Sequence, residues 1–268
     1  MLPLPFAKPM LNAYMAEVPG RHDAASYASG GGGILPLRVT GVSFEAAGHC
    51  LLNDVSFHLE RGPLTVILGA NGAGKSLLLK ICHGLLSPTR GEVSWQSTSR
   101  VRVRNSQAMV FQRPVLLRRS VAANIDYVLR LHGMAKPERN QRIDACLQLA
   151  GLSHLRRRSA RVLSGGEQQK LALARAWAVR PEIVYLDEPT ANIDPAATLF
   201  VENLIGQFSR NGVKVVLTTH DLAQARRLAD EVLFLHQGRL LEQSPARQFF
   251  DGPENPLARA FIHEDLFC

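Results

Sequence analysis

The chain has 268 residues, of which 46% are hydrophobic and 20% are charged. This balance supplies enough apolar side chain for the core of an ordinary folded domain, and it excludes intrinsic disorder or a fibrous repeat for the chain as a whole. The formal net charge of +8, carried mostly by arginine, indicates an anionic partner, but charge alone does not separate phosphate, lipid and nucleic acid.

Membrane insertion and secretion are not expected from the sequence. No run reaches the roughly 18 to 20 apolar residues that cross a bilayer. Pro3, Pro5 and Pro9 interrupt the apolar residues at the start, where a secretory signal needs a continuous apolar centre. The four cysteines are far apart and form no C-x-x-C pair, which favours a reducing compartment. We therefore expect a cytoplasmic location and a membrane role only through a partner.

Residues 1–36 differ in composition from the rest of the chain. They contain four prolines within the first 20 residues and a serine followed by four glycines at 29–33, and such glycines are costly to order. We expect a flexible N-terminal extension over 1–36. The next segments, 37–44 and 51–59, are short apolar runs bounded by turn residues, which predicts strands of a small antiparallel sheet.

The rest of the chain alternates between buried-type strands and helices. An apolar run at 64–68 ends in a glycine loop and is followed by a helical pattern. Helical spacing predicts a helical subdomain inserted at about 113–163, with helices at 120–132 and 138–150. Further strands are expected at 183–186, 213–217 and 232–235, separated by helices at 196–208 and 222–229. This order predicts an α/β fold with a mostly parallel sheet, a main domain at 37–245 and a C-terminal helical tail at 246–268.

A phosphate-binding motif follows the strand at 64–68. The sequence Gly69-Ala-Asn-Gly-Ala-Gly-Lys-Ser76 fits G-x-x-x-x-G-K-[ST] and lies between an expected strand and an expected helix, which is the context that the motif requires. Its glycines let backbone N–H groups surround phosphate oxygens, and the helix start adds positive potential. Lys75 is expected to reach the β and γ phosphates and Ser76 to bind Mg²⁺, which indicates a P-loop NTPase core.

Two adjacent carboxylates, Asp187 and Glu188, follow the strand at 183–186. Alternating side-chain direction would turn Asp187 toward Mg²⁺ and Glu188 toward the space beyond the γ phosphate. Such a pair alone is usually a solvated loop start or a helix cap. The glycine loop upstream is what favours the nucleotide interpretation.

The segment Leu163-Ser-Gly-Gly-Glu167 begins another expected helix. A serine before Gly-Gly-Glu is a good N-cap, which explains the helix but not the order and distance of this segment relative to the other motifs. With it, the chain resembles the nucleotide-binding cassettes of ABC transporters over residues 37 to about 245. In that family such a signature closes on the γ phosphate of an ATP held by the opposite subunit.

The resemblance assigns roles to further positions. Gln112 is similar to the Q-loop glutamine that touches Mg²⁺, Asp194 to the D-loop at the subunit interface, and His220 to the switch histidine near the attacking water. Alone, each has a common structural explanation: a solvated glutamine, an aspartate that starts a helix, and a structural histidine. The implied nucleotide-binding residues are Gly69, Ala70, Asn71, Gly72, Ala73, Gly74, Lys75, Ser76, Leu77 and Gln112. The implied metal ligands are Ser76, Gln112 and Asp187, the catalytic residues Glu188 and His220, and the residues acting in trans Ser164, Gly165, Gly166, Glu167 and Asp194.

Three positions depart from the family pattern. Ala46 stands where an aromatic ring usually stacks on adenine, a contact worth about 1 kcal/mol or more. We therefore expect either a lower nucleotide affinity or a substitute ring from Phe44 or His49. Leu77 replaces the usual hydroxyl residue after the loop, which removes one contact to the α phosphate. Glu167 ends the signature, a variation that we expect to be tolerated.

The resemblance implies a head-to-tail dimer with ATP and Mg²⁺ as cofactors. The loop with Lys75 and the segment at Ser164 are expected to lie too far apart in one subunit to hold the same phosphate. Glu188 would then act as the general base and His220 would orient the attacking water. The segment 113–119, apolar in its centre and basic at both ends, is expected either to dock a short permease helix or simply to lead into the next helix.

The implied partners are a second copy of the chain, transmembrane permease subunits and a substrate-binding protein, with the chain peripheral at the cytoplasmic face of the inner membrane. Residues 112–120 resemble cassettes of bacterial importers for small oxyanions, tungstate in particular. Two alternatives stay open: a soluble ATPase acting on nucleic acid, which the positive charge would suit, and an export cassette. Nucleic acid is the weaker partner, because the chain lacks a long coiled-coil insertion and its arginine clusters have no interleaved aromatics.

Overall fold

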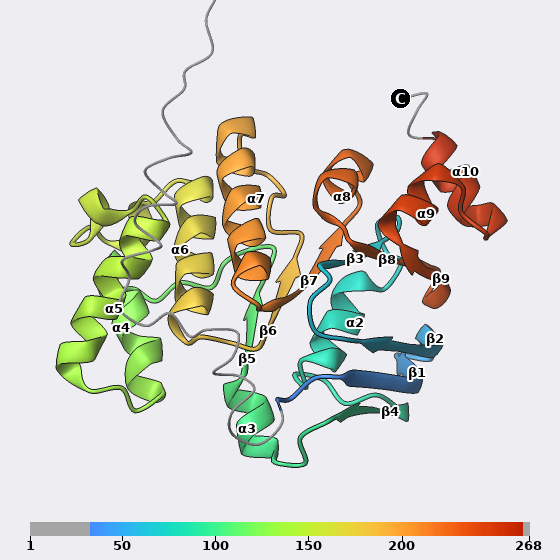
Figure 1. Cartoon of the computed structure of the whole chain (residues 1–268), viewed down its shortest axis with the longest axis horizontal. Helices are drawn as coiled ribbons and strands as arrows, with labels where there is room; N and C mark the ends of the chain where they lie inside the picture. Colours follow the sequence, from blue (N-terminus) through green and yellow to red (C-terminus); the bar gives the residue numbers. More distant parts are fainter. Residues whose placement is uncertain (1–32, 265–268) are drawn as a thin grey trace, which may run out of the picture. The chain divides into compact units, whose positions relative to one another are not determined.

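Two β-sheets form the framework of the computed structural model, which describes residues 33–264 (Figure 1). The smaller sheet has three antiparallel strands in the order β2 (His49–Leu59), β1 (Leu37–Ala46) and β4 (Arg90–Trp95). The antiparallel N-terminal subdomain expected from the sequence is thus confirmed. The sequence pattern does not reveal β4, because RGEVSW contains only two apolar side chains and none of its residues is fully buried.

The larger sheet has six strands in the order β5, β6, β7, β3, β8 and β9. Their bounds are β3 (Thr65–Leu68), β5 (Gln107–Val110), β6 (Ile183–Asp187), β7 (Lys214–Thr219), β8 (Glu231–His236) and β9 (Arg239–Pro245). Neighbours from β5 to β8 are parallel, and β8 and β9 pair antiparallel. The mostly parallel sheet of the expected α/β fold is confirmed. The four strands that precede predicted site residues lie next to one another.

The strands β3, β6, β7 and β8 are buried on both faces of the larger sheet, which explains why they are mostly apolar. On β6, Val184 and Leu186 enter one core, whereas Ile183 and Tyr185 enter the other. The first core is shared with α7 and α8, and the second with α2 and the smaller sheet. The bounds of these helices are α2 (Lys75–Cys82), α7 (Pro195–Arg210) and α8 (Leu222–Leu228).

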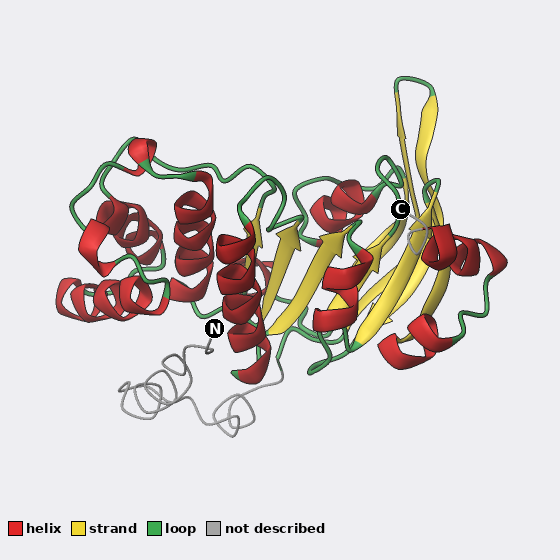
Figure 2. Cartoon of the chain, turned by 90° about the horizontal axis from the view of Figure 1, so that it is seen from above, coloured by secondary structure: helices red, strands yellow, loops and turns green. Residues whose placement is uncertain are grey.

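A group of helices is inserted between β5 and β6 and lies to one side of the larger sheet (Figure 2). It consists of α4 (Val121–Leu131), α5 (Lys136–Leu149), two 3₁₀ turns (Ser153–Leu155 and Ala160–Val162) and α6 (Gly165–Ala178). The helices expected at 120–132 and 138–150 are confirmed, with bounds shifted by one or two residues. The group has a core of its own, and α6 also packs on α7 and β5, so it joins the insertion to the sheet.

At its N-terminal end the domain begins earlier than expected. Ile34 and Leu35 are 0% and 3% exposed in the core of the smaller sheet, so packing begins before residue 37. The rest of the expected extension, residues 1–32, lies outside the described residues. The C-terminal tail is interrupted by a Gly-Pro pair and forms two helices, α9 (Ala246–Asp251) and α10 (Pro256–Glu264). A short helix that the sequence does not reveal, α3 (Arg100–Asn105), precedes β5. Within residues 33–264, no helix has both the length and the apolar content to cross a bilayer.

Candidate functional site

The loop between β3 and α2 is shaped by glycines. Gly69, Gly72 and Gly74 have φ values of 157°, 82° and 101°, in the region that favours glycine. A Cβ on Gly69 would lie 2.1 Å from the carbonyl oxygen of Leu235, and one on Gly74 would lie 2.8 Å from the side chain of Leu52. The loop therefore passes close to two strands before it enters α2. The first N–H groups of α2 have no side-chain cap, and such a helix start favours an anion.

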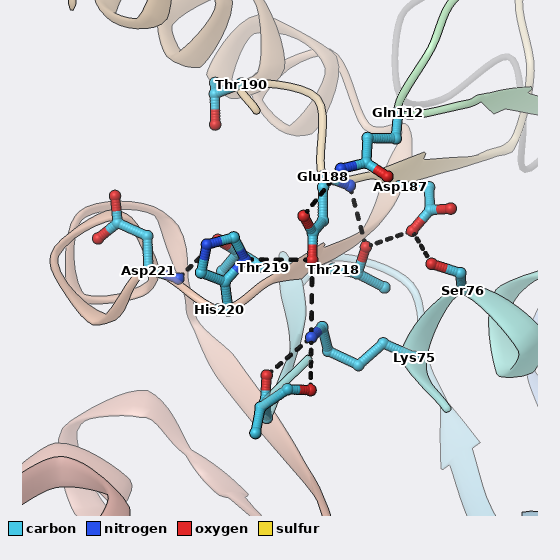
Figure 3. Close-up of polar contacts among 12 residues, drawn as sticks. Lys75, Ser76, Gln112, Asp187, Glu188, Thr190, Thr218, Thr219, His220 and Asp221 are labelled. Atoms are coloured by element: carbon cyan, nitrogen blue, oxygen red, sulfur yellow. Dashed lines mark hydrogen bonds and ion pairs between the residues drawn. The ribbon is translucent and has the colours of Figure 1, made fainter. Parts of the chain in front are cut away.

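The ammonium group of Lys75 lies inside this loop (Figure 3). It donates to the carbonyl oxygens of Gly69 at 2.7 Å and Ala70 at 3.0 Å, and its side chain is 5% exposed. Its Nζ is 3.6 Å from Oε1 of Glu188. Burial lowers the pKa of Lys75, and the Glu188 carboxylate partly opposes that shift. A partly desolvated cation of this kind favours contact with a further anion such as phosphate.

Oxygen-bearing side chains from neighbouring elements meet beside the lysine. Asp187, at the end of β6, accepts at Oδ1 from Oγ of Ser76 at 2.6 Å and from Oγ1 of Thr218 at 2.8 Å (Figure 3). The two donors belong to α2 and β7, so the carboxylate is held from two elements. Mg²⁺ prefers oxygen ligands of these types. The hydroxyl of Ser76, the carboxylate of Asp187 and the amide of Gln112 form a donor set that fits this cation.

Glu188 is the point at which three loops converge. Its backbone has a φ of 43°, and its N–H donates to the carbonyl oxygen of Thr218 at 3.2 Å and to Oγ1 of the same residue at 3.0 Å. Its Oε1 is 3.2 Å from Nδ1 of His220, and its Oε2 accepts from Nε2 of Gln112 at 3.3 Å. The carboxylate thus faces Lys75, His220 and Gln112. From this position it can take a proton from a water molecule in the adjoining cavity.

These groups border a cavity of about 760 Å³. The sequence-predicted residues that line it are Asn71, Gly72, Gly74, Lys75, Ser76, Leu77, Gln112, Glu188 and His220. Four predicted residues lie behind this lining: Gly69 and Ala70 hold Lys75, Ala73 packs in the core of the smaller sheet, and Asp187 reaches the cavity through Ser76. The structure therefore brings the predicted loop, metal and catalytic residues to one place.

The three positions discussed for contact with the base lie outside the cavity lining. Ala46, Phe44 and His49 do not line the cavity, and Phe44 packs against the core of the smaller sheet. Leu51 of β2, 45% exposed, lines the cavity instead, together with Lys80 of α2. The lining from the described residues therefore includes no Phe, Tyr or Trp.

The signature residues do not line this cavity. Ser164 forms a capping box at the start of α6: its Oγ accepts from the N–H of Glu167 at 3.3 Å, and the Glu167 carboxylate accepts from the N–H of Ser164 at 2.8 Å. A Cβ on Gly166 would lie 2.7 Å from that of Ala197, so packing on α7 itself requires glycine. Asp194 caps α7. The helix-cap explanations therefore hold within one chain. The residues that do not line the cavity are Ser164, Gly165, Gly166, Glu167 and Asp194.

Several residues at the site are not apparent from the motifs. Thr218 holds Asp187 and the backbone of Glu188, and Ala191 and Asn192 line the cavity. A signal for Thr218 exists in the sequence. It is a hydroxyl residue near the end of a buried strand, where an apolar residue is the rule, two positions before His220.

A second cavity, of about 370 Å³, lies between the edge of the larger sheet and the helical insertion. Val115 and Leu131 line it and are 71% and 68% exposed. The segment 113–119 at its rim is held firmly. The buried side chain of Asn124 accepts from the N–H of Leu117 at 2.8 Å and donates to its carbonyl oxygen at 3.2 Å. Arg175 donates to the carbonyl oxygen of Val115 at 2.7 Å. The apolar centre of this segment thus borders a preformed groove.

Comparison with known proteins gives relatives over most of the chain. Residues 52–191 match the family model described as ABC transporter. The chain is 38% identical over 209 residues to the tungstate uptake system ATP-binding protein TupC of Peptoclostridium acidaminophilum, covering 78% of this chain and 98% of that protein. It is 34% identical over 227 residues to the phosphate import ATP-binding protein PstB of Campylobacter jejuni, covering 79% and 91%. It is also 34% identical over 225 residues to the methionine import ATP-binding protein MetN of Corynebacterium jeikeium, covering 80% and 61%.

Solved structures of similar architecture agree with these relatives. The structure of cbiO1 from Clostridium perfringens, described as part of the ABC transporter complex cbiONQ, has a TM-score of 0.73 at 27% identity. It covers 85% of this chain and 98% of that chain. A structure described as the ATP binding subunit of an ABC transporter has a TM-score of 0.75 at 25% identity and covers 87% of this chain and all of that chain.

Proposed function

Since this chain belongs to the ABC transporter family as an ATP-binding and ATP-hydrolysing subunit, we propose that it powers bacterial import of a small oxyanion such as tungstate. The observation that carries the motor role is the convergence of Lys75, Ser76, Asp187, Glu188 and His220 on one cavity. Relatives named for tungstate and phosphate support the oxyanion. The relatives named above are described as uptake or import proteins, which favours this proposal over a nucleic-acid ATPase or an export cassette.

The P-loop holds the phosphates of ATP in this proposal. Backbone N–H groups between Gly72 and Ser76 surround the oxygens, and Lys75 exchanges its contact with Glu188 for the β and γ phosphates. Ser76, Asp187 and Gln112 hold Mg²⁺. When bound, Mg²⁺ supplies positive charge that offsets the charge developing on the phosphate oxygens.

Glu188 takes the proton of the attacking water. The water oxygen bonds to the γ phosphorus, the bond from that phosphorus to the bridging oxygen breaks, and ADP and inorganic phosphate leave. His220, whose Nδ1 is 3.2 Å from Glu188, orients the carboxylate and the water. Departure of Lys75 toward the phosphates frees Oε1 of Glu188 to accept the proton.

The working unit is a head-to-tail dimer. Ser164, Gly165, Gly166 and Glu167 start a helix outside the cavity of their own chain, so they are free to complete the cavity of a second copy. Asp194 follows Asn192, which lines the cavity, and it reaches the same interface. Closure of two copies excludes water and adds N–H groups at the γ phosphate.

The groove between the sheet and the helical insertion receives the permease. Its exposed apolar residues Val115 and Leu131 suit an apolar helix, and Arg113, Arg118 and Arg119 flank the segment with positive charge. The chain then sits peripherally at the cytoplasmic face of the inner membrane, with a substrate-binding protein on the other side of the permease.

Reconstitution tests this function. The full chain, its permease and its binding protein are placed in proteoliposomes, and ATP hydrolysis is measured with the binding protein loaded with tungstate, phosphate or methionine. We expect tungstate to stimulate hydrolysis most. Stimulation by methionine alone would contradict the oxyanion, and magnesium-independent or absent hydrolysis in every condition would contradict the motor role.

A further inference from the structure

A buried polar side chain behind the cavity joins the two loops that carry Glu188 and His220. Gln224 lies on α8, four residues after His220, and is 1% exposed. Its Nε2 donates to Oγ1 of Thr190 at 2.7 Å and to Oε1 of Glu202 at 3.2 Å. Thr190 lies two residues after Glu188 on the loop that leads to α7 (Figure 3). One amide therefore connects α8, the loop after β6 and the helix α7.

The partner of Gln224 on α7 is itself held in place. Glu202 is 7% exposed, and Arg227 of α8 donates to both of its oxygens, from Nε at 3.0 Å and from Nη2 at 2.7 Å. The two-point geometry fixes the carboxylate more firmly than a single contact. We refer to Gln224, Thr190, Glu202 and Arg227 as the Gln224 clamp.

The clamp also acts on the turn that carries His220. Asp221, the next residue, caps α8 by accepting from the N–H of Gln224 at 2.9 Å, and its own N–H donates to Oγ1 of Thr219 at 3.0 Å. The backbone of Gln224 thus holds the loop after β7, and its side chain holds the loop after β6. The distance of 3.2 Å between His220 and Glu188 depends on how these two loops sit relative to each other.

Burying the amide of Gln224 destabilises the fold, which indicates that the side chain does more than fill space. Oε1 of Gln224 is buried and has no hydrogen-bond partner among the described residues. A buried acceptor without a partner destabilises the fold, and an apolar side chain of similar volume would avoid that penalty. The two bonds donated by Nε2 are what an apolar residue cannot supply.

We propose that Gln224 is a positioning residue for ATP hydrolysis, because the clamp sets the separation between His220 and Glu188. The proposal rests on the proposed function and adds a role for a residue outside the cavity. Thr190 continues directly into Ala191 and Asn192, which line the cavity, and then into Asp194. Movement of this loop is therefore transmitted through Thr190 to α8 and to His220.

Gln224→Met tests the proposal, because methionine keeps the length of the side chain and removes both donated bonds. We expect kcat for ATP hydrolysis by the full chain to fall about tenfold, with KM for ATP within twofold of wild type, since small errors in catalytic geometry reduce turnover and the P-loop is untouched. Gln207→Met is the matched control. Gln207 is also a buried glutamine, 7% exposed on α7, with an Oε1 that lacks a partner among the described residues, and its substitution should leave kcat unchanged.

Two double-variant comparisons separate positioning from general destabilisation. In a His220→Ala background, Gln224→Met should cause little further loss, because the clamp acts through His220. Thr190→Val removes the acceptor hydroxyl, should lower kcat by a similar factor and should not add to Gln224→Met. If hydrolysis in the His220→Ala background is too slow to measure, the comparison of Thr190→Val with the Thr190→Val, Gln224→Met double variant tests the proposal instead. If Gln224→Met does not fold, the kcat of Thr190→Val alone tests it.

The outcomes are distinguishable from failure of the proposed function. If the wild-type chain shows no magnesium-dependent ATP hydrolysis, the motor role is contradicted, irrespective of the results for the Gln224 variants. With wild-type hydrolysis intact, the clamp proposal is overturned by an unchanged kcat in Gln224→Met, by a rise of KM in proportion to the loss, by an equal loss in Gln207→Met, or by full additivity in the double variants.

Discussion

Replacing Thr218 by valine removes one hydroxyl and keeps the shape of the side chain, so the variant isolates the bonds that this hydroxyl makes. Thr218 is fully buried. Its Oγ1 donates to Asp187 at 2.8 Å and accepts from the N–H of Glu188 at 3.0 Å. The N–H of Glu188 retains a second acceptor, the carbonyl oxygen of Thr218 at 3.2 Å. The principal loss is therefore the hydrogen bond to the Asp187 carboxylate.

The size of the effect follows from the charge of the acceptor. A hydrogen bond to a charged group contributes about 1.5–3 kcal/mol, roughly twice the value for two neutral groups. After the substitution Asp187, 5% exposed, keeps Ser76 as its donor at 2.6 Å and faces a methyl group on the other side. We expect Thr218→Val to lower the free energy of unfolding by about 2–3 kcal/mol.

The neighbouring threonine supplies the control. Thr219 is 4% exposed, and its Oγ1 accepts from the backbone N–H of Asp221 at 3.0 Å, which is a bond between neutral groups. Thr219→Val should therefore cost about 1 kcal/mol. Urea unfolding followed by circular dichroism measures both values. A loss in Thr218→Val equal to or smaller than that in Thr219→Val would refute the argument that the carboxylate sets the size of the effect.

Three further predictions concern Glu188, the cavity wall at Leu51 and a buried lysine. Glu188→Gln should bind ATP with wild-type affinity and lower phosphate release by about two orders of magnitude or more; unchanged hydrolysis would remove Glu188 from its role. Leu51→Tyr adds a ring to the cavity wall and should tighten ATP binding by about 1 kcal/mol, measured as a lower dissociation constant against Leu51→Val. Burial lowers the pKa of Lys214 from 10.5 to about 8, so the unfolded chain binds more protons between these values and this group makes stability rise with pH there. From pH 8 to pH 10, wild type should gain about 2 kcal/mol relative to Lys214→Met in urea unfolding; a difference that stays constant with pH would exclude this titration.

The sequence predicts the contents of the site well because parallel strands end at a common edge. The glycine loop follows β3, Gln112 follows β5, Asp187 ends β6 and Glu188 comes directly after it, and His220 follows β7. The glycine loop and the carboxylate pair could be identified from a strand and the residues after it, whereas Gln112 and His220 are assigned only through the resemblance to ABC cassettes. The order β5, β6, β7, β3 could not be predicted, because it depends on crossover connections rather than on any local pattern.

Tertiary contacts account for what the sequence leaves out. Thr218 is recognised as a site residue only when its strand lies beside β6, and Gln224 only when α8 packs near Thr190. Leu51 belongs to the smaller sheet, and only the fold places it against the P-loop. Conversely, both hydrogen bonds of the Ser164 capping box form within one chain, so the local sequence pattern reports the helix start and not the contacts of a second copy.

The helical insertion leaves the larger sheet after β5 and returns to it at β6, which is the adjacent strand. Its two points of attachment are therefore close together, and the rest of the sheet is continuous without it. A segment with neighbouring entry and exit can be exchanged for the equivalent segment of a related cassette, provided that α6 is carried with it, since α6 packs on both sides. Such chimaeras would exchange the segment 113–119 together with the start of α6, while the loops after β3, β6 and β7 keep their own sequence.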